Sequence, residues 1–196
     1  MFELNWQTYS SQIHTFLNDL EVSDVNGIGI SADLAFSQWL KKCYSLRVAE
    51  GEIFFIGNGA SASLASHFAA DILKNGRIRT HLFTDLTLLT ALANDEGYEQ
   101  SFSLPLAWTM RRGDMLVAIS SSGASPNILS AVEAAWQKGG YVVTLSSFRR
   151  DNPLRYAGHL NFYIPAPTYG LAESCHAALL HYWTDKMTSI GIQEGA

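Results

Sequence analysis

The sequence predicts an α/β fold in which a parallel sheet is covered by helices on both faces. Three observations support this prediction. The apolar runs at residues 53–56, 115–119 and 141–145 are continuous, as in strands that are buried on both faces. Segments with helical spacing separate these runs, and such alternation is typical of parallel sheets. The 196 residues are enough for one domain with a full core.

Two helices are predicted before the first strand. Residues 6–20 carry apolar side chains at helical spacing, namely Tyr9, Ile13, Phe16, Leu17 and Leu20. Residues 21–29 are expected to form a loop, and a second helix is expected over residues 31–49, ended by Gly51. We therefore assign residues 1–50 to helices that pack on the core and form an oligomer surface, and residues 51–196 to the α/β domain.

The rest of the chain alternates between strands and helices. After the strand at 53–56, the spacing predicts a helix at 64–73, a strand at 79–83 and a helix at 86–93 that a turn at 94–98 ends. A short helix at 102–109, the strand at 115–119, a helix at 128–138 and the strand at 141–145 follow. A last strand at 160–164 precedes a closing helix at 171–190.

Composition makes several classes of protein improbable. The 13 basic residues against 18 acidic ones form no basic stripe, so nucleic-acid binding has little support. Cys43 and Cys175 form no spaced pair, which suits a reducing compartment. The first residues lack the features of a signal peptide, and no apolar run is long enough to cross a bilayer. We expect a cytoplasmic protein without a nucleic-acid or membrane partner.

A turn rich in small residues follows the first strand. Gly57 and Gly59 flank Asn58, and a helix comes next, so backbone N–H groups can approach an anion. Neither standard nucleotide fingerprint fits, because Ala62 replaces the third glycine and the turn has no Walker lysine. A strand–loop–helix turn without any ligand remains the alternative.

The serine loop, residues 120–125, is the strongest local signal. Its four serines lie between a buried strand and a helix whose first turn Pro126 fits: Ser120, Ser121, Ser122 and Ser125. Ligands of open α/β sheets bind beyond the carboxyl ends of the strands, where this loop and the turn at Asn58 should both lie. The loop has no lysine or arginine, which favours one phosphate monoester over a polyphosphate. A solvated serine turn is the alternative reading.

Two groups of side chains could bind a metal. His67 and Asp71 share one face of a helix, although most such pairs are packing or surface pairs. On the closing helix, Glu173 and His176 share a face, and His181 lies about 12 Å beyond Glu173. Either Glu173 precedes the regular helix, or the site collects ligands from more than one subunit. Such a set of ligands suits zinc.

Together these motifs resemble the SIS (sugar isomerase) domain, and most closely its phosphoheptose isomerase branch. The resemblance covers about residues 35–190. It depends on five segments: residues 57–61, 67–71, 93–95, 119–125, and the spacing from Glu173 to His181. It implies a flavodoxin-like three-layer αβα sandwich in a cytoplasmic homotetramer, with active sites at subunit interfaces. It also implies an aldose–ketose isomerase of heptose biosynthesis that acts through an enediol, with one zinc per subunit. The expected substrates are sedoheptulose 7-phosphate and D-glycero-D-manno-heptose 7-phosphate.

The resemblance also assigns roles to individual residues. The substrate would be bound by Asn58, Gly59, Ala60, Asn94, Asp95, Ser120, Ser121, Ser122, Ser125 and Glu173. The metal ligands would be His67, Asp71, Glu173 and His181. Asp71 and His181 would also be the catalytic acid–base pair.

Two positions depart from the family pattern. Asp71 stands where the family has its catalytic glutamate, and Glu173 stands where it has a glutamine ligand. A related non-catalytic branch, which assists replication initiation through protein contacts, has serine at the carboxylate position. Because Asp71 keeps a carboxylate and His181 is present, the sequence favours the isomerase. A phosphosugar-binding SIS protein that acts through protein contacts is the alternative.

Overall fold

One sheet runs through the part of the chain that the computed structural model describes, residues 5–191. Its strands are β1 (Glu21–Asp24), β2 (Gly29–Ile30), β3 (Glu52–Gly57), β4 (Arg79–Leu82), β5 (Met115–Ser120), β6 (Tyr141–Ser146) and β7 (Leu160–Tyr163). Their order is β2-β1-β7-β6-β5-β3-β4. The strands β4, β3, β5, β6 and β7 are parallel, and their order is that of flavodoxin-like sheets. The predicted fold class is confirmed.

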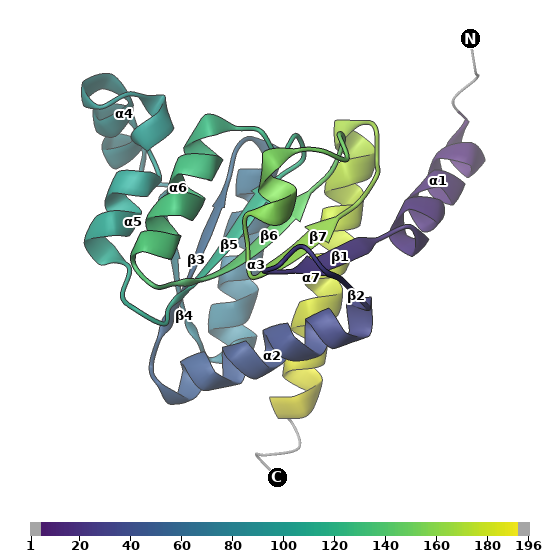
Figure 1. The fold of residues 1–196 in the computed structure, drawn as a ribbon, viewed down its shortest axis with the longest axis horizontal. Helices are drawn as coiled ribbons and strands as arrows, with labels where there is room; N and C mark the ends of the chain where they lie inside the picture. Colours follow the sequence, from purple (N-terminus) through teal and green to yellow (C-terminus); the bar gives the residue numbers. More distant parts are fainter. Residues whose placement is uncertain (1–4, 192–196) are drawn as a thin grey trace.

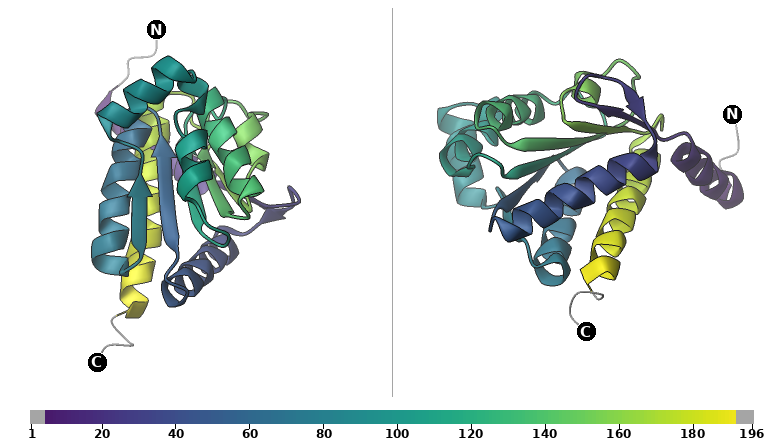
Figure 2. Two further views of the ribbon diagram at one scale, coloured as in Figure 1. Left: turned by 90° about the vertical axis from the view of Figure 1, so that its left-hand side faces the viewer. Right: turned by 60° about the horizontal axis from the view of Figure 1, so that its bottom comes forward.

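Helices cover both faces of this sheet (Figure 1). The α-helices of the described residues are α1 (Trp6–Asn18), α2 (Ala32–Val48), α3 (Ala60–Asp71), α4 (Leu86–Asp95), α5 (Ser103–Thr109), α6 (Pro126–Gln137) and α7 (Tyr169–Gly191). Figure 2 (right) shows α2 and α7 on one side of the sheet and α5 and α6 on the other. The molecule is therefore a three-layer αβα sandwich.

The continuous apolar runs supply both cores of the sandwich. Successive side chains of a strand point to opposite faces, so Phe55 joins the cluster under α2, α3 and α7. Its neighbours Phe54 and Ile56 join the cluster under α5 and α6. In β5, Val117 likewise joins the cluster under α2, α3 and α7, and Leu116 joins the cluster under α5 and α6. A strand between two helical layers needs apolar side chains at every position, which explains the absence of polar alternation.

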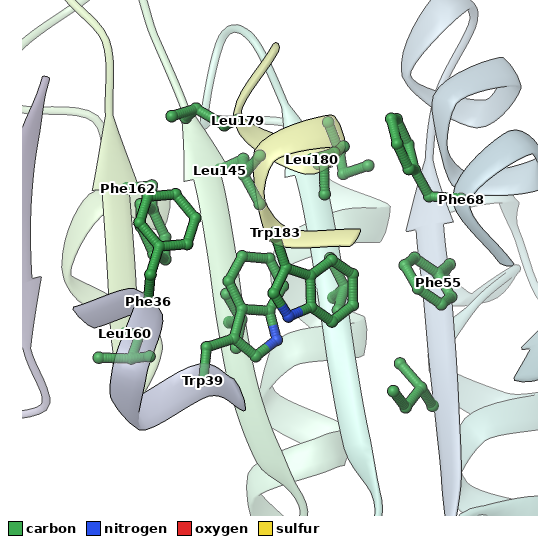
Figure 3. Close-up of a cluster of buried hydrophobic side chains, with 14 of the residues drawn as sticks. Phe36, Trp39, Phe55, Phe68, Leu145, Leu160, Phe162, Leu179, Leu180 and Trp183 are labelled. Carbon is green, nitrogen blue, oxygen red and sulfur yellow. The ribbon is translucent and has the colours of Figure 1, made fainter. Parts of the chain in front are cut away.

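Stacked aromatic rings join α2 to α7 (Figure 3). The indoles of Trp39 and Trp183 stack with centroids 4.0 Å apart, and Phe162 of β7 lies 5.4 Å from Trp39. Trp39 Nε1 donates to Met115 Sδ at 3.3 Å. Helix α2 is thus packed into the sandwich with both tryptophans fully buried.

The prediction of a loop over residues 21–29 is wrong, because this segment forms the hairpin β1–β2. Strand β1 also pairs antiparallel with β7, so the sheet is mixed at this edge. Asp24 Oδ1 accepts hydrogen bonds from the backbone N–H groups of Asn26 and Ile28, and Gly27 takes a φ of 74°. These bonds make the turn. Strands of four and two residues are too short to show a reliable period.

Several helix boundaries also differ from the prediction. Helix α3 begins at Ala60, directly after Gly59, and ends at Asp71, where the π-helical turn η1 (Ile72–Gly76) follows. Helix α4 continues through Asp95, and α6 begins at Pro126. The small residues of the first turn of α3 give no apolar period, so its start cannot be read from spacing. A Cβ at Gly57 would lie 2.5 Å from the backbone of Ser61, so only glycine allows this approach of β3 to α3.

Helix α1 projects from the body of the sandwich (Figure 1). None of its residues is buried, and Trp6 is 78% exposed. Tyr9, Ile13 and Phe16 are only partly covered by the core.

Among the described residues, no helix is long and apolar enough to span a membrane.

Candidate functional site

A small cavity lies at the carboxyl ends of β3 and β5. Its volume is about 100 Å³. It is lined by Asn58, Ser61, Ile119, Ser120, Ser121, Ser122, Ser125, Tyr169 and Glu173. The fold thus brings the turn at Asn58, the four serines of the serine loop and Glu173 to one place. We call it the serine cavity.

Three hydroxyl groups of the serine loop lie close together. Ser120 Oγ is 3.4 Å from Ser125 Oγ and 3.5 Å from Ser122 Oγ. Ser125 is the residue before α6, but its hydroxyl accepts no capping bond, so the first N–H groups of the helix do not donate to it. Converging hydroxyls beside the N-terminus of a helix can bind an anion such as a phosphate monoester.

Gly123 and Asn152 shape this loop. Gly123 has a φ of 61°, and a Cβ there would lie 1.9 Å from Asn152 Oδ1. Its N–H donates to Ser120 Oγ at 3.2 Å, and its carbonyl accepts from Leu154 N. Asn152 Nδ2 donates to the carbonyl oxygens of Ser147 and Arg149. The loop is therefore held from the neighbouring β6–β7 connection, which fixes the serine hydroxyls.

His176 is buried behind the serine loop and supports it. Its Nε2 lies 3.2 Å from Ser147 Oγ and 3.3 Å from the carbonyl oxygen of Ser146. The N–H of Ser147 in turn donates to the carbonyl oxygen of Ser121 at 3.0 Å. Burial lowers the pKa of His176 to about 4, so the ring is neutral at pH 7. This histidine is a structural group of the core.

Asn58 is held by two side chains that no sequence motif marks. The amides of Asn58 and Asn127 exchange two hydrogen bonds, of 2.9 and 3.0 Å. The hydroxyl of Tyr98 also donates to Asn58 Oδ1 at 3.0 Å. Neither partner has a spacing signal, since the contacts join elements that are far apart along the chain.

A possible metal-binding group lies on α3 and α7. One ligand atom from each of His67, Asp71 and His181 lies within 4.8 Å of the other two. His67 Nε2 is 3.4 Å from Asp71 Oδ2, as their shared helical face predicts. Two imidazoles and one carboxylate are a donor set that suits a divalent metal. The side chain of His67 is 52% exposed, so further ligands can reach the group.

Glu173 does not join this group within one chain. It lies inside α7, so the expectation that it precedes the regular helix is wrong. It lines the serine cavity, two turns before His181. The other alternative, that a neighbouring subunit brings the ligands together, stays a prediction.

Asn94, Asp95, Gly59 and Ala60 lie outside the serine cavity. Asn94 and Asp95 are in the last turn of α4, not in the turn that was predicted, and Asn94 Nδ2 donates to Asp95 Oδ1. Both are exposed. Gly59 borders a second cavity of about 220 Å³ on the other side of Asn58, which is lined mostly by apolar residues. Ala60 is exposed at the start of α3.

Comparison with known proteins identifies the family. The model of the SIS domain family matches residues 9–147. A phosphoheptose isomerase of Maridesulfovibrio salexigens is 32% identical over 149 residues, which are 72% of each chain. One from Helicobacter pylori is 35% identical over 143 residues, 69% of this chain and 73% of the relative.

The solved structures agree with these relatives. The structure of phosphoheptose isomerase GmhA from Neisseria gonorrhoeae is 28% identical, with a TM-score of 0.77 over 93% of this chain and 96% of that one. A phosphoheptose isomerase from Francisella tularensis, 23% identical, has the same fold with a TM-score of 0.80 over the same shares of the two chains. This chain therefore belongs to the SIS domain family, in its phosphoheptose isomerase branch.

Proposed function

We propose that this protein is an aldose–ketose isomerase that interconverts sedoheptulose 7-phosphate and D-glycero-D-manno-heptose 7-phosphate. Its relatives are named phosphoheptose isomerases. The observation that carries the proposal is that α3 and α7 each contribute both to the serine cavity and to the His67–Asp71–His181 group. One pair of helices thus links an anion site to groups that transfer protons.

The serine cavity binds the phosphate in this proposal. Ser120, Ser122 and Ser125 supply the converging hydroxyls, with Ser121 beside them and Asn58 opposite. Phosphate contacts are remote from the reacting carbons, so their binding energy serves to place C1 and C2 against the catalytic groups. Asn94, Asp95, Gly59 and Ala60 would contact the sugar only when the site is complete.

Asp71 and His181 transfer the protons. The isomerisation moves one proton between C1 and C2 through an enediol, so a base must remove it from carbon and an acid must serve the oxygens. A carboxylate and an imidazole perform both tasks near neutral pH. A zinc ion bound by His67, Asp71 and His181, with Glu173 from a neighbouring copy, would supply positive charge beside the carbonyl.

The active site is completed in a homotetramer. Glu173 and His181 lie about 12 Å apart along α7, which is too far for one metal within a single chain. His67 and His181 of the group on α3 and α7 are exposed, and α1 offers an uncovered apolar face for another copy. We place the protein in the cytoplasm, where sugar phosphates are found.

Turnover and proton exchange test this proposal together. The purified protein, loaded with zinc, is incubated with sedoheptulose 7-phosphate in deuterium oxide. We expect the aldose product, with solvent deuterium at C1 or C2 of the sugar. If phosphate esters bind but neither turnover nor exchange occurs with any heptose or hexose phosphate, the protein is a phosphosugar-binding member of the family instead.

A further inference from the structure

The amide of Asn58 has one hydrogen-bonding group left for a ligand. An asparagine side chain offers two N–H donors and an oxygen that accepts two bonds. The oxygen of Asn58 accepts from both Asn127 Nδ2 and Tyr98 Oη, at 3.0 Å each. One of its N–H groups donates to Asn127 Oδ1 at 2.9 Å. A single N–H therefore remains, on a residue that lines both the serine cavity and the second, mostly apolar cavity.

Asn127 is the more deeply buried of the two partners, with 1% of its surface exposed. It lies in the first turn of α6, directly after the serine loop, whereas Asn58 follows β3. The reciprocal amide pair thus ties together the two loops that line the serine cavity. Leaving a buried amide without its hydrogen-bond partner destabilises the folded state. Rotation of either side chain would break the pair and is therefore unfavourable.

Tyr98 connects a third segment to the same amide. It begins the short helix η2 (Tyr98–Gln100), which follows α4 and is separated from it by Gly97, whose φ is 89°. Helix α4 buries only Leu92 and carries Asn94 and Asp95 at its end. A helix with so little buried surface depends on such contacts for its position.

We propose that Asn127 and Tyr98 are positioning residues that hold the side-chain amide of Asn58 so that it donates one hydrogen bond to a ligand oxygen and accepts none from the ligand. This inference builds on the proposed function and names the chemistry of one contact. The ligand atom must be an acceptor, such as a phosphate oxygen, and a ligand hydroxyl cannot donate to Asn58. Tyr98 also links the position of α4 to the same amide.

Binding of inorganic phosphate tests the proposal without requiring turnover. Phosphate is titrated calorimetrically into the parent, Tyr98→Phe and Asn127→Ala. When the amide of Asn58 is no longer held in one orientation, phosphate binding should weaken about 3- to 10-fold in each variant. This is less than the effect of removing the hydrogen bond to the charged phosphate altogether. Tyr156→Phe is the matched control, because Tyr156 is similarly exposed but lines a separate cavity beside the β1–β2 hairpin. It should bind phosphate like the parent.

Nuclear magnetic resonance of the Asn58 side chain supplies a readout that a merely structural role would not change. In the parent, added phosphate should shift one of the two Nδ2 protons, and Asn58→Asp should lose both signals and phosphate binding. In Tyr98→Phe and Asn127→Ala, the phosphate-dependent shift should be reduced. With sugar phosphate as substrate, KM should rise while kcat changes little, because this contact is equal in the ground and transition states.

The outcomes separate this inference from the proposed function. Phosphate affinity equal to the parent in folded Tyr98→Phe and Asn127→Ala would overturn the positioning role, and so would a parent that does not bind phosphate. If Asn127→Ala does not fold, Tyr98→Phe decides alone, since Tyr98 is 52% exposed and its replacement should leave the fold intact. If phosphate binding changes as expected but no sugar phosphate turns over, the positioning role stands and the isomerase proposal fails.

Discussion

The imidazole rings of His67 and His181 lie 5.4 Å apart between centroids, at an interplanar angle of 67°. They come from α3 and α7, which pack against the same face of the sheet. The ring of Phe68 contacts both, at 4.9 and 4.8 Å. This fully buried phenylalanine fixes the spacing of the two histidines beside Asp71, and several predictions depend on that group.

The first prediction concerns the metal. Zinc titrated into metal-free protein should bind, and His181→Ala should weaken its binding at least about tenfold. Removing a residue that only hydrogen-bonds a metal ligand already costs about 10- to 100-fold in metal affinity, and loss of a ligand itself should cost no less. His14→Ala is the matched control, since His14 is an exposed histidine of α1 whose ring hydrogen-bonds with Asn18, far from the group on α3 and α7 in the sequence. Equal zinc affinity in the parent and His181→Ala would show that the group does not bind the metal.

The second prediction concerns the base. Asp71→Asn keeps the size of the side chain but removes its basicity, so turnover of the sugar phosphate should fall by about 10²–10⁴-fold. The Kd of the sugar phosphate should change much less, because the serine cavity is untouched. Asp71→Glu keeps a carboxylate and should retain more activity than Asp71→Asn. Turnover of Asp71→Asn at the rate of the parent would refute the role of Asp71 in proton transfer.

The third prediction concerns the phosphate. Combining Ser120→Ala with Ser125→Ala should leave the fold intact and weaken binding of any sugar phosphate. Each lost bond to the charged group should cost about 1.5–3 kcal/mol. Ser130→Ala is the control, because Ser130 lies further along α6 and lines a different depression. Calorimetry on the folded double variant measures the effect, and an unchanged affinity would exclude the serine loop as the phosphate site.

The fourth prediction concerns assembly. Deleting residues 1–20 removes α1, which has no buried residue within its own chain. The deletion should reduce the oligomer and the isomerase activity together, because we place the complete site between subunits. Light scattering and the activity assay on one sample measure both. A fully active monomer would contradict the shared site.

The fifth prediction concerns stability at acidic pH. Burial lowers the pKa of His176 to about 4 from the ordinary value of 6.5. Between these values the unfolded chain binds a proton at this histidine and the folded chain does not. The free energy of unfolding should therefore fall as the pH decreases from 6.5 towards 4, by up to about 1.4 kcal/mol per pH unit.

Comparison of two proteins isolates the contribution of His176. Urea unfolding of the parent and of His176→Gln is measured across this pH range. The other titrating groups are common to both, so the difference in slope reports His176. The variant should be less dependent on pH than the parent. Identical slopes would mean that His176 is protonated equally in the folded and unfolded chains.

Local patterns of apolar residues are sufficient to predict the α/β fold class. Phe54, Phe55 and Ile56 predict a strand buried on both faces because each of them faces a helix layer. The hairpin at residues 21–30 was missed because its register depends on pairing with β7. Short edge strands of this kind are defined by their neighbours, and their own residues carry little signal.

By itself, the sequence determined the fold class, the turn at Asn58, the serine loop and the helical pair of His67 and Asp71. Each of these depends on residues within a few positions of one another, where backbone geometry sets the distance. The resemblance places His181 with that pair and Glu173 with the serines, but the distances between these groups and the pairing of Asn127 with Asn58 come from the tertiary structure. These contacts cross between elements whose separation is set by how the side chains of both cores pack, and no local period records that packing.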